Sequence, residues 1–339
     1  MKRFLPWLIR LLFIFLAAGL LYWTWRNTDA DVGSALRNCA LPTMLLALAL
    51  YGVAQVLGAW RWKTLLDVQG LHFSLWLALK LTLVGGFFSL IIPGAVTGDL
   101  IKIACATRKY PGCAPQLVLV DMIDRIIGLS GIFFAAAFAT VCRLAQLFPM
   151  LREQDAWMLT LCIVAINAGC LGSIVLYLVF HTKPTWERWR WLQRCIHWWA
   201  AHLPKALTGI IAKMHDGLEL YREHRGALLR ALLISIVIHF TVSGTIFCIG
   251  RSLGEHGMAP SQYVLTTQLS NVTGLLPIAP GGIGLRDAVS AKLLQFFQAE
   301  PAQVCGDIPL INSLIIVFWG LTGALAYALT PSISGARKQ

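Results

Sequence analysis

The sequence predicts an all-α polytopic membrane protein with about seven spanning helices and two opposed re-entrant helical hairpins, arranged as an inverted repeat. Three observations support this prediction. The composition is strongly apolar, the basic residues gather in particular segments, and one motif occurs twice inside apolar stretches. We treat the whole chain, 1–339, as a single integral membrane domain.

Composition identifies the medium in which the chain folds. Hydrophobic residues make up 57% of the chain and charged residues 13%, and the mean hydropathy is +0.68. Soluble proteins usually carry a higher share of charged residues, so this composition is typical of a membrane protein. A spanning helix needs about 20 predominantly apolar residues. Seven segments are apolar on that scale: 4–25, 40–59, 75–93, 116–142, 157–180, 228–250 and 308–330.

The placement of the basic residues predicts the topology. The net charge is +12, but the loops near 26–37, 143–155, 251–261 and 299–307 hold few Lys or Arg and most of the loop acids. Cytoplasmic loops carry the excess of Lys and Arg. We therefore expect both termini in the cytoplasm of a bacterium or archaeon, a chain in the inner membrane, and contact with anionic lipid in place of nucleic acid. The basic positions are Lys2, Arg3, Arg61, Lys63, Lys102, Arg108, Lys109, many within 183–230, Arg337 and Lys338.

A motif that breaks an apolar helix occurs twice. Pro93 and Pro277 are 184 positions apart (277 − 93 = 184), and the same offset aligns other residues around them. Paired Gly/Pro-interrupted segments in two halves point to a transporter site built from discontinuous helices. Two unrelated proline kinks are the alternative, because Pro and Gly are common in membrane helices. The other aligned pairs are Leu81/Leu265, Thr82/Thr266, Gly98/Gly282, Lys102/Arg286, Ala104/Ala288 and Arg108/Lys292.

The topology makes the repeat an inverted one. A first half, 1–182, contains the hairpin 75–108, which enters from the cytoplasm, and a second half, 228–339, contains the hairpin 262–298. Three crossings separate the hairpins, so the second enters from the opposite face. Non-helical backbone at that depth has to be buried in protein or line a wet cavity. A central polar cavity is therefore expected.

The linker 183–227 differs from the rest of the chain. Tryptophans and leucines fall at helical spacing on one side and basic residues on the other, which suits a helix lying in the membrane interface. A soluble linker that docks on the bundle is the alternative.

Charged residues within apolar segments need a reason, since each costs on the order of 2.5–3.5 kcal/mol at a helix centre. Asp121 and Arg125 are four residues apart, with the acid first, which favours a pair within one helix. Asp124 is then free to face elsewhere. The alternative is a cluster that only anchors the helix near the interface.

The residues after each break form the predicted binding site. Helix starts present free N–H groups and a positive dipole end to a phosphate, and an arginine adds a bidentate contact. Glycines there allow positive φ and close approach. We expect no catalytic residue, cofactor or metal. The candidate residues are Pro93, Gly94, Gly98, Asp99, Lys102, Asp124, Arg125, Asn271, Pro277, Gly281, Gly282, Gly284, Arg286 and Asp287.

Several weaker candidates remain. His239 is expected to be a packing residue, and Gln268 and Thr273, like Asn271, contact either a headgroup or another helix. Asp29 and Asp31 have the spacing of the metal-binding acids of membrane glycosyltransferases, which also arises by chance. The nine cysteines show no metal-ligand spacing.

Several of these motifs together resemble the lysylphosphatidylglycerol synthase transmembrane-region family, also called the flippase-like domain family. In its multiple peptide resistance factors, the membrane half moves aminoacylated lipid across the bilayer. Asp287 replaces the usual Glu and Lys102 the usual Arg, and we expect no aminoacyl-transferase domain after the last span. The matching motifs are Trp60-Arg61-Trp62, Gly86-Phe87-Phe88, Pro93-Gly94, Gly98-Asp99, Asp124-Arg125 with Gly128, and Pro280-Gly281-Gly282 with Gly284 and Arg286-Asp287.

The resemblance implies a membrane domain that handles lipid and is not an enzyme. We expect a flippase for an anionic phospholipid, an aminoacylated lipid or a polyprenyl-phosphate-linked headgroup. The alternatives are a membrane-embedded transferase acting on a lipid-linked substrate and a structural partner in lipid or envelope synthesis. Membrane lipid is the expected partner, with a homo-oligomer or a lipid-biosynthesis protein as further possibilities.

Overall fold

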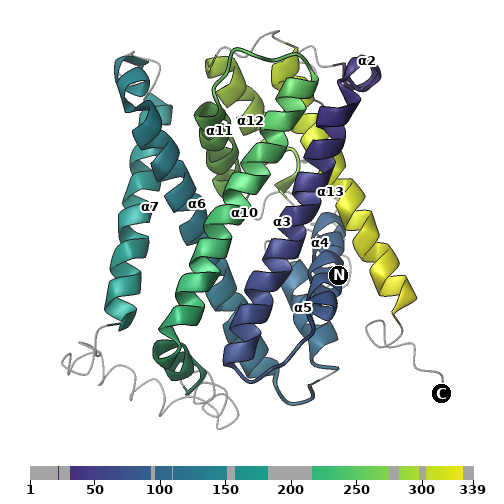
Figure 1. Ribbon diagram of the computed structural model, residues 1–339, viewed down its shortest axis with the longest axis vertical. Coiled ribbons are helices and arrows are strands. Elements are labelled where there is room, and N and C mark those ends of the chain that lie inside the picture. The colour runs from purple at the N-terminus through teal and green to yellow at the C-terminus, as the bar shows by residue number, and fades with distance from the viewer. Residues whose placement is uncertain are drawn as a thin grey trace, which may run out of the picture.

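The described part of the chain is a helical bundle without a β-strand (Figure 1). The computed structural model describes residues 22, 31–92, 96–108, 110–150, 157–181, 216–274, 282–297 and 303–330. The helices are α2 (Val32–Asn38), α3 (Leu41–Val68), α4 (Leu75–Ile91), α5 (Thr97–Ala106), α6 (Ala114–Met150), α7 (Trp157–His181), α10 (Arg225–Ser252), α11 (Pro260–Thr273), α12 (Leu285–Phe296) and α13 (Val304–Leu329).

Five of these helices are long and apolar enough to cross a membrane, namely α3, α6, α7, α10 and α13. They correspond to five of the seven predicted segments, so the multi-pass membrane class is confirmed. The segment predicted at 75–93 is the shorter apolar helix α4. The predicted first span, 4–25, apart from residue 22, and most of the linker 183–227 lie outside the described residues.

Both predicted breaks separate one helix from the next. α4 ends at Ile91 and α5 begins at Thr97, while α11 ends at Thr273 and α12 begins at Leu285. Each pair packs closely, and the two pairs lie at opposite ends of the bundle: α4 and α5 in its lower half, α11 and α12 in its upper half (Figure 1). With the offset of 184, the position equivalent to the start of α5 is 97 + 184 = 281. α12 begins at Leu285, four residues after that equivalent position.

The charged residues on which the predicted topology rests are distributed unevenly along the bundle (Figure 1). The ends of α3 and α7, the start of α10, the whole of α5 and the end of α13 lie together at the lower end (Figure 1). Most of the described basic residues that set the predicted topology belong to these segments. The acid-containing turn between α10 and α11 lies at the other end, together with α2.

Helix α3 is longer than predicted at its C-terminal end. The predicted span stops at residue 59, whereas the helix continues to Val68. Arg61 and Lys63 do not end it because each charge is neutralised, by Asp124 and by Asp67 respectively.

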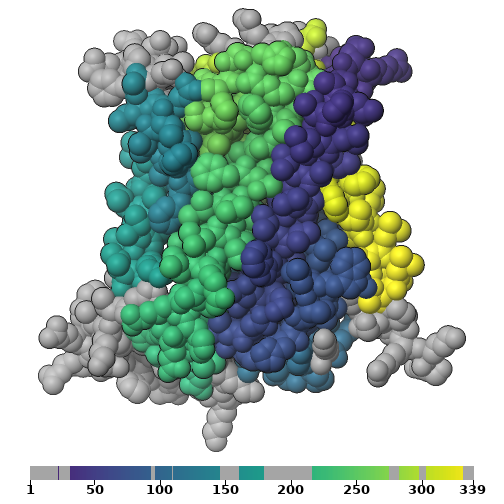
Figure 2. All heavy atoms as spheres, viewed as in Figure 1, coloured from purple at the N-terminus to yellow at the C-terminus, as the bar shows by residue number. Residues whose placement is uncertain are grey.

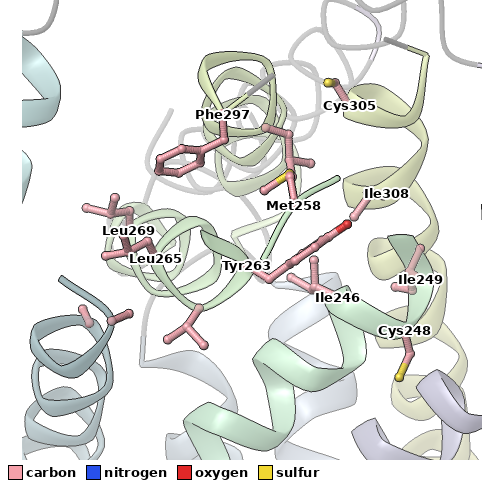
Figure 3. Close-up of a cluster of buried hydrophobic side chains, with 14 of the residues drawn as sticks. Ile246, Cys248, Ile249, Met258, Tyr263, Leu265, Leu269, Phe297, Cys305 and Ile308 are labelled. Atoms are coloured by element: carbon pink, nitrogen blue, oxygen red, sulfur yellow. The ribbon is translucent and has the colours of Figure 1, made fainter. Parts of the chain in front are cut away.

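The core has an upper and a lower part. In the upper part, α10, α11 and α13 meet around Tyr263, whose fully buried ring lies among aliphatic side chains (Figure 3). In the lower part, Trp62 of α3 is the largest buried side chain, packed with residues of α4, α5 and α6. α3 and α10 cross one face of the molecule side by side (Figure 2).

Close helix contacts depend on glycine at a few positions. At Gly323 of α13, a Cβ atom would lie 2.0 Å from the carbonyl oxygen of Leu83 in α4, whereas at Gly172 of α7 it would meet nothing within 4 Å. The α4–α13 contact therefore requires the missing side chain.

We predict that Gly323→Ala lowers the melting temperature of the purified protein, because overpacking costs about 1–3 kcal/mol. Gly172→Ala is the matched control, since both changes gain the same helix propensity, about 1 kcal/mol. Equal melting temperatures for the two variants would contradict the close packing of α4 on α13.

Candidate functional site

The lower half of the bundle contains a cluster of charged side chains where α3, α5 and α6 meet. Arg61 makes a bidentate contact with Asp124, with Nε 2.7 Å from Oδ1 and Nη2 2.9 Å from Oδ2. Its remaining terminal nitrogen, Nη1, donates to the Ser235 hydroxyl of α10 at 3.0 Å. All three guanidinium nitrogens of Arg61 are thus occupied.

Lys102 and Asp121 form the most buried part of this cluster. Lys102 is 6% exposed, and its Nζ lies 2.8 Å from Asp121 Oδ1 and 3.5 Å from Asp99 Oδ1. Its Nζ also lies 4.6 Å from the centre of a Trp62 ring, whose indole N–H donates to Asp121 at 2.6 Å. A carboxylate and an aromatic face together neutralise a charge that would be costly unpaired.

Arg125 completes the cluster at its more exposed side. Its Nη2 and Nε lie 2.6 and 2.7 Å from Asp99 Oδ2. The predicted pair of Asp121 with Arg125 is therefore wrong, whereas Asp124 does face away from its own helix, towards Arg61 of α3. The reason is that α5 and α3 offer these residues partners between helices. We call Arg61, Asp99, Lys102, Asp121, Asp124 and Arg125 the charge cluster.

The charge cluster has no net charge, and each of its three cations is bonded to a carboxylate. Three carboxylates face three basic groups at bonding distance. Charge-assisted bonds of this kind hold helices together when they are well formed. An anionic ligand would have to displace a carboxylate to bind here.

Arg286 lies at the start of α12, in the other half of the bundle. Its Nη2 donates to Ser313 Oγ of α13 at 2.9 Å and lies 3.3 Å from Asp287 Oδ1. Asp287 is fully buried, and its Oδ2 accepts from the Gly284 N–H at 3.0 Å and from the Ser313 hydroxyl at 2.8 Å. Asp287 therefore caps its own helix and steadies Arg286.

The predicted backbone freedom of the glycines is confirmed at two positions. Gly282 has a φ of 74° and Gly284 a φ of 92°. A Cβ atom at Gly282 would lie 3.0 Å from the Cα of Gly274, so the segment entering α12 also passes close to the end of α11. A residue with a side chain would strain both features.

Arg286 differs from Arg61 of the charge cluster in the number of its nitrogens that make hydrogen bonds. Among the described residues, the hydrogen bonds of Arg286 involve Nη2 alone, so Nε and Nη1 have no protein partner there. Neither nitrogen is one of the fully buried atoms that lack a hydrogen-bond partner. Within the described part of the chain, two nitrogen donors of Arg286 are thus not used by hydrogen bonds.

The remaining predicted residues have mostly structural contacts. Gln268 of α11 donates to Ser243 of α10 at 2.9 Å, which is a bond between helices, whereas Thr273 donates to the carbonyl of Ser270 in its own helix at 2.7 Å. His239 bonds the carbonyl of Gly128 at 3.0 Å, which fits a packing residue. Gly98 begins α5 against Gly85 of α4, and Asn271 is half-buried near the end of α11. Pro93, Gly94, Pro277 and Gly281 lie outside the described residues.

The acidic loop before α2 shows a structural role for one of its two acids. Asp31 accepts from the Ser34 N–H at 3.1 Å and caps α2, and this bond lowers the pKa of the carboxyl. Asp29 lies outside the described residues. In the described ranges, no three His, Cys, Asp or Glu side chains are grouped so as to hold a metal ion.

Three residues that bond in the charge cluster or to Arg286 were not identified from the sequence. Arg61 was assigned to the cytoplasmic charge count, although its position beside Trp60 and Trp62 in a matching motif was a signal. Ser235 and Ser313 gave no signal, because a serine in an apolar helix usually bonds its own backbone.

These features define a class: a multi-pass helical membrane protein in which two interrupted helices bring charged residues inside the bundle. The comparison with protein families then identifies the group. Residues 7–306 match the family described as the lysylphosphatidylglycerol synthase TM region, and the chain belongs to it. It is therefore a membrane protein of a lipid-related family, as the sequence motifs predicted. The search of curated proteins found no match.

We predict that Asp121→Ala lowers the stability of the folded protein by about 3–5 kcal/mol, because it leaves the buried Lys102 without its nearest carboxylate. Thermal melting in detergent measures this. The double variant Asp121→Ala/Lys102→Met should recover most of the loss.

Asp67→Ala is the matched control for Asp121→Ala. It breaks the partly exposed Lys63–Asp67 pair, and exposed pairs contribute less than about 1 kcal/mol. If Asp121→Ala destabilises no more than Asp67→Ala, the charge cluster does not hold the helices together.

Proposed function

We propose that this protein moves an anionic lipid between the leaflets of the membrane and that Arg286 binds the phosphate of that lipid. The observation that carries the proposal is that two nitrogens of Arg286, at the start of α12, have no hydrogen-bond partner among the described residues. A planar guanidinium binds phosphate with two parallel hydrogen bonds, and a helix start favours an anion. The family's relation to lipid supports the same assignment.

An inverted repeat would supply the alternating access that transport requires, and several aligned positions support one. Leu81 and Leu265 are both almost fully buried. Thr82 and Thr266 both have a buried hydroxyl without a partner in the described part of the chain.

The aligned glycines also play similar parts. Gly98 lies against Gly85 of α4, and Gly282 lies against Gly274 at the end of α11. In each case a glycine lets the second helix of a pair start close to the first. We propose that the two pairs are re-entrant hairpins that enter the membrane from opposite faces.

We predict a C-terminus in the cytoplasm, and residues 154 and 255 together on the outer face. Reporters fused after Gln339 and inserted near Gln154 and Glu255 measure this. A C-terminus on the outer face, or reporters near 154 and 255 on opposite faces, would contradict the inverted repeat.

The charge cluster has a supporting role in this proposal. Because its cations are already bound to carboxylates, it holds α5 against α3 and α6 and leaves the anion to Arg286. The rigid lower pair then provides a fixed element against which the upper pair moves.

We further propose that the activity needs no chemical cosubstrate. Labelled phosphatidylglycerol in vesicles containing only the purified protein tests this, because transport then proceeds with no donor or divalent ion added. Movement that requires a donor and a divalent ion, and that Asp29→Asn abolishes, would instead favour the transferase.

We predict that Arg286→Lys lowers the rate of lipid movement about tenfold or more while leaving the melting temperature near wild type. Lysine keeps the charge beside Asp287 but loses the planar fork, and a charge-assisted hydrogen bond contributes about 1.5–3 kcal/mol. The matched control is Arg230→Lys, at an exposed arginine that bonds its own helix.

A second variant separates binding from stability. Arg286→Ala/Asp287→Asn removes both charges of the buried pair, so no unpaired charge remains in the fold. The guanidinium proposed to bind the phosphate is removed as well. Wild-type transport by this double variant would show that Arg286 stabilises α12 and does not bind the lipid.

A further inference from the structure

An apolar groove of about 430 Å³ lies beside Arg286, on the side of the bundle formed by α2 and α13. Its lining is almost entirely hydrocarbon. The described residues that line it, apart from Ser313, are Tyr22, Val32, Ile283, Leu310, Leu314 and Val317.

One wall of the groove is a straight stripe along α13. Leu310, Ser313, Leu314 and Val317 follow the spacing of one helix face, i, i+3, i+4 and i+7. At 1.5 Å per residue this stripe is about 10 Å long. An extended hydrocarbon chain can lie along it.

One lining residue connects the groove to the guanidinium. Ser313 is the polar residue of the stripe, and its hydroxyl oxygen lies 2.9 Å from Arg286 Nη2. Ile283, on the opposite wall, is three residues before Arg286 in the segment that enters α12. The groove thus has a polar position beside a cation that has two donors available.

The groove adjoins an exposed apolar surface of α13. Leu314 is 50% exposed, and Phe318 and Leu321 continue the same helix as exposed apolar side chains. α13 is one of the helices long enough to span. An apolar cavity of this kind stays dry, so hydrocarbon from the surrounding bilayer is its natural occupant.

We propose that this groove holds the hydrocarbon tail of the lipid whose phosphate binds Arg286. The inference rests on the proposed function and narrows its ligand to a phosphate with a long apolar tail, in place of a soluble anion. It also gives the route of entry: the lipid reaches Arg286 sideways, between α2 and α13, while its tail remains in hydrocarbon.

A second apolar cavity provides an internal comparison. It also measures about 430 Å³ and lies between α6, α7 and α10, lined by residues such as Ile126, Ile174 and Leu229. None of its described lining residues is charged. The arginines next to its lining in sequence bond within the protein, Arg125 of α6 to Asp99 and Arg230 of α10 to its own helix, so we expect this cavity not to hold the tail of a phosphate-bound lipid.

The test compares two probes on the full-length protein in detergent: dioleoyl phosphatidylglycerol and glycerol 3-phosphate, which has the phosphate but no tail. Ligand binding raises the melting temperature, so the shift measured against probe concentration gives the affinity. Wild type should bind the lipid at least a hundredfold more tightly than glycerol 3-phosphate, because each buried methylene adds to the affinity.

Leu314→Trp fills the mouth of the groove and should weaken lipid binding about tenfold without changing the affinity for glycerol 3-phosphate. Ile174→Trp fills the other cavity and should leave both affinities unchanged. Comparable binding of the two probes by wild type, or unchanged lipid affinity in Leu314→Trp, would overturn the groove proposal.

Arg286→Lys distinguishes this inference from the function on which it rests. It should weaken both probes, whereas Leu314→Trp weakens the lipid alone. If Leu314→Trp binds lipid as wild type does and Arg286→Lys does not, the phosphate site stands and the groove is wrong. If Arg286→Lys binds both probes normally, the proposed phosphate site is wrong.

Discussion

The bond between Lys102 and Asp121 is the interaction on which the lower half of this bundle depends. An ammonium group removed from water costs several kcal/mol unless a partner of opposite charge comes with it. Here the partner comes from α6, and Trp62 of α3 contacts both groups. A short helix, α5, is thereby fixed to two long ones. The backbone break that precedes α5 needs such an anchor, because a 10-residue helix has little stability of its own.

The two halves of the molecule use their basic residues differently. In the charge cluster of the lower half, Arg61, Lys102 and Arg125 are each matched by a carboxylate from another helix. In the upper half Asp287 bonds mainly to Gly284 and Ser313, and within the described part of the chain only one nitrogen of Arg286 makes a hydrogen bond. Arginines of the charge cluster bind helices to one another, whereas Arg286 keeps nitrogen donors that no described residue uses. The reason is that Asp287, the carboxylate beside Arg286, accepts a hydrogen bond from the Gly284 N–H and caps α12.

Local sequence signals predicted the helices and their interruptions well. Apolar segments locate α3, α6, α7, α10 and α13, since length and hydropathy are properties of each segment alone. The breaks near Pro93 and Pro277 followed from residues that cannot continue a helix. The positive φ at Gly282 and Gly284 followed from glycine itself.

Partner choice was not predictable in the same way. Asp121 has a suitable base four residues along its own helix, but its bonds go to Lys102 and Trp62 because α5 and α3 pack against α6. Arg61 looked like a loop charge because its acceptor, Asp124, is 63 positions away. Such pairs depend on how helices approach one another, which sequence spacing within one helix does not contain. The role of Ser313 was invisible for the same reason.

The neutrality of the charge cluster has an electrical consequence. A membrane potential does work on net charge, about 2.3 kcal/mol per elementary charge per 100 mV. Three cations bound to three carboxylates move as a body of zero charge, and so do Arg286 and Asp287 together. Rearrangement of these helices within the membrane field is therefore electrically silent. Under the proposed function, a current measured during lipid movement would therefore come from the lipid and its counter-ions.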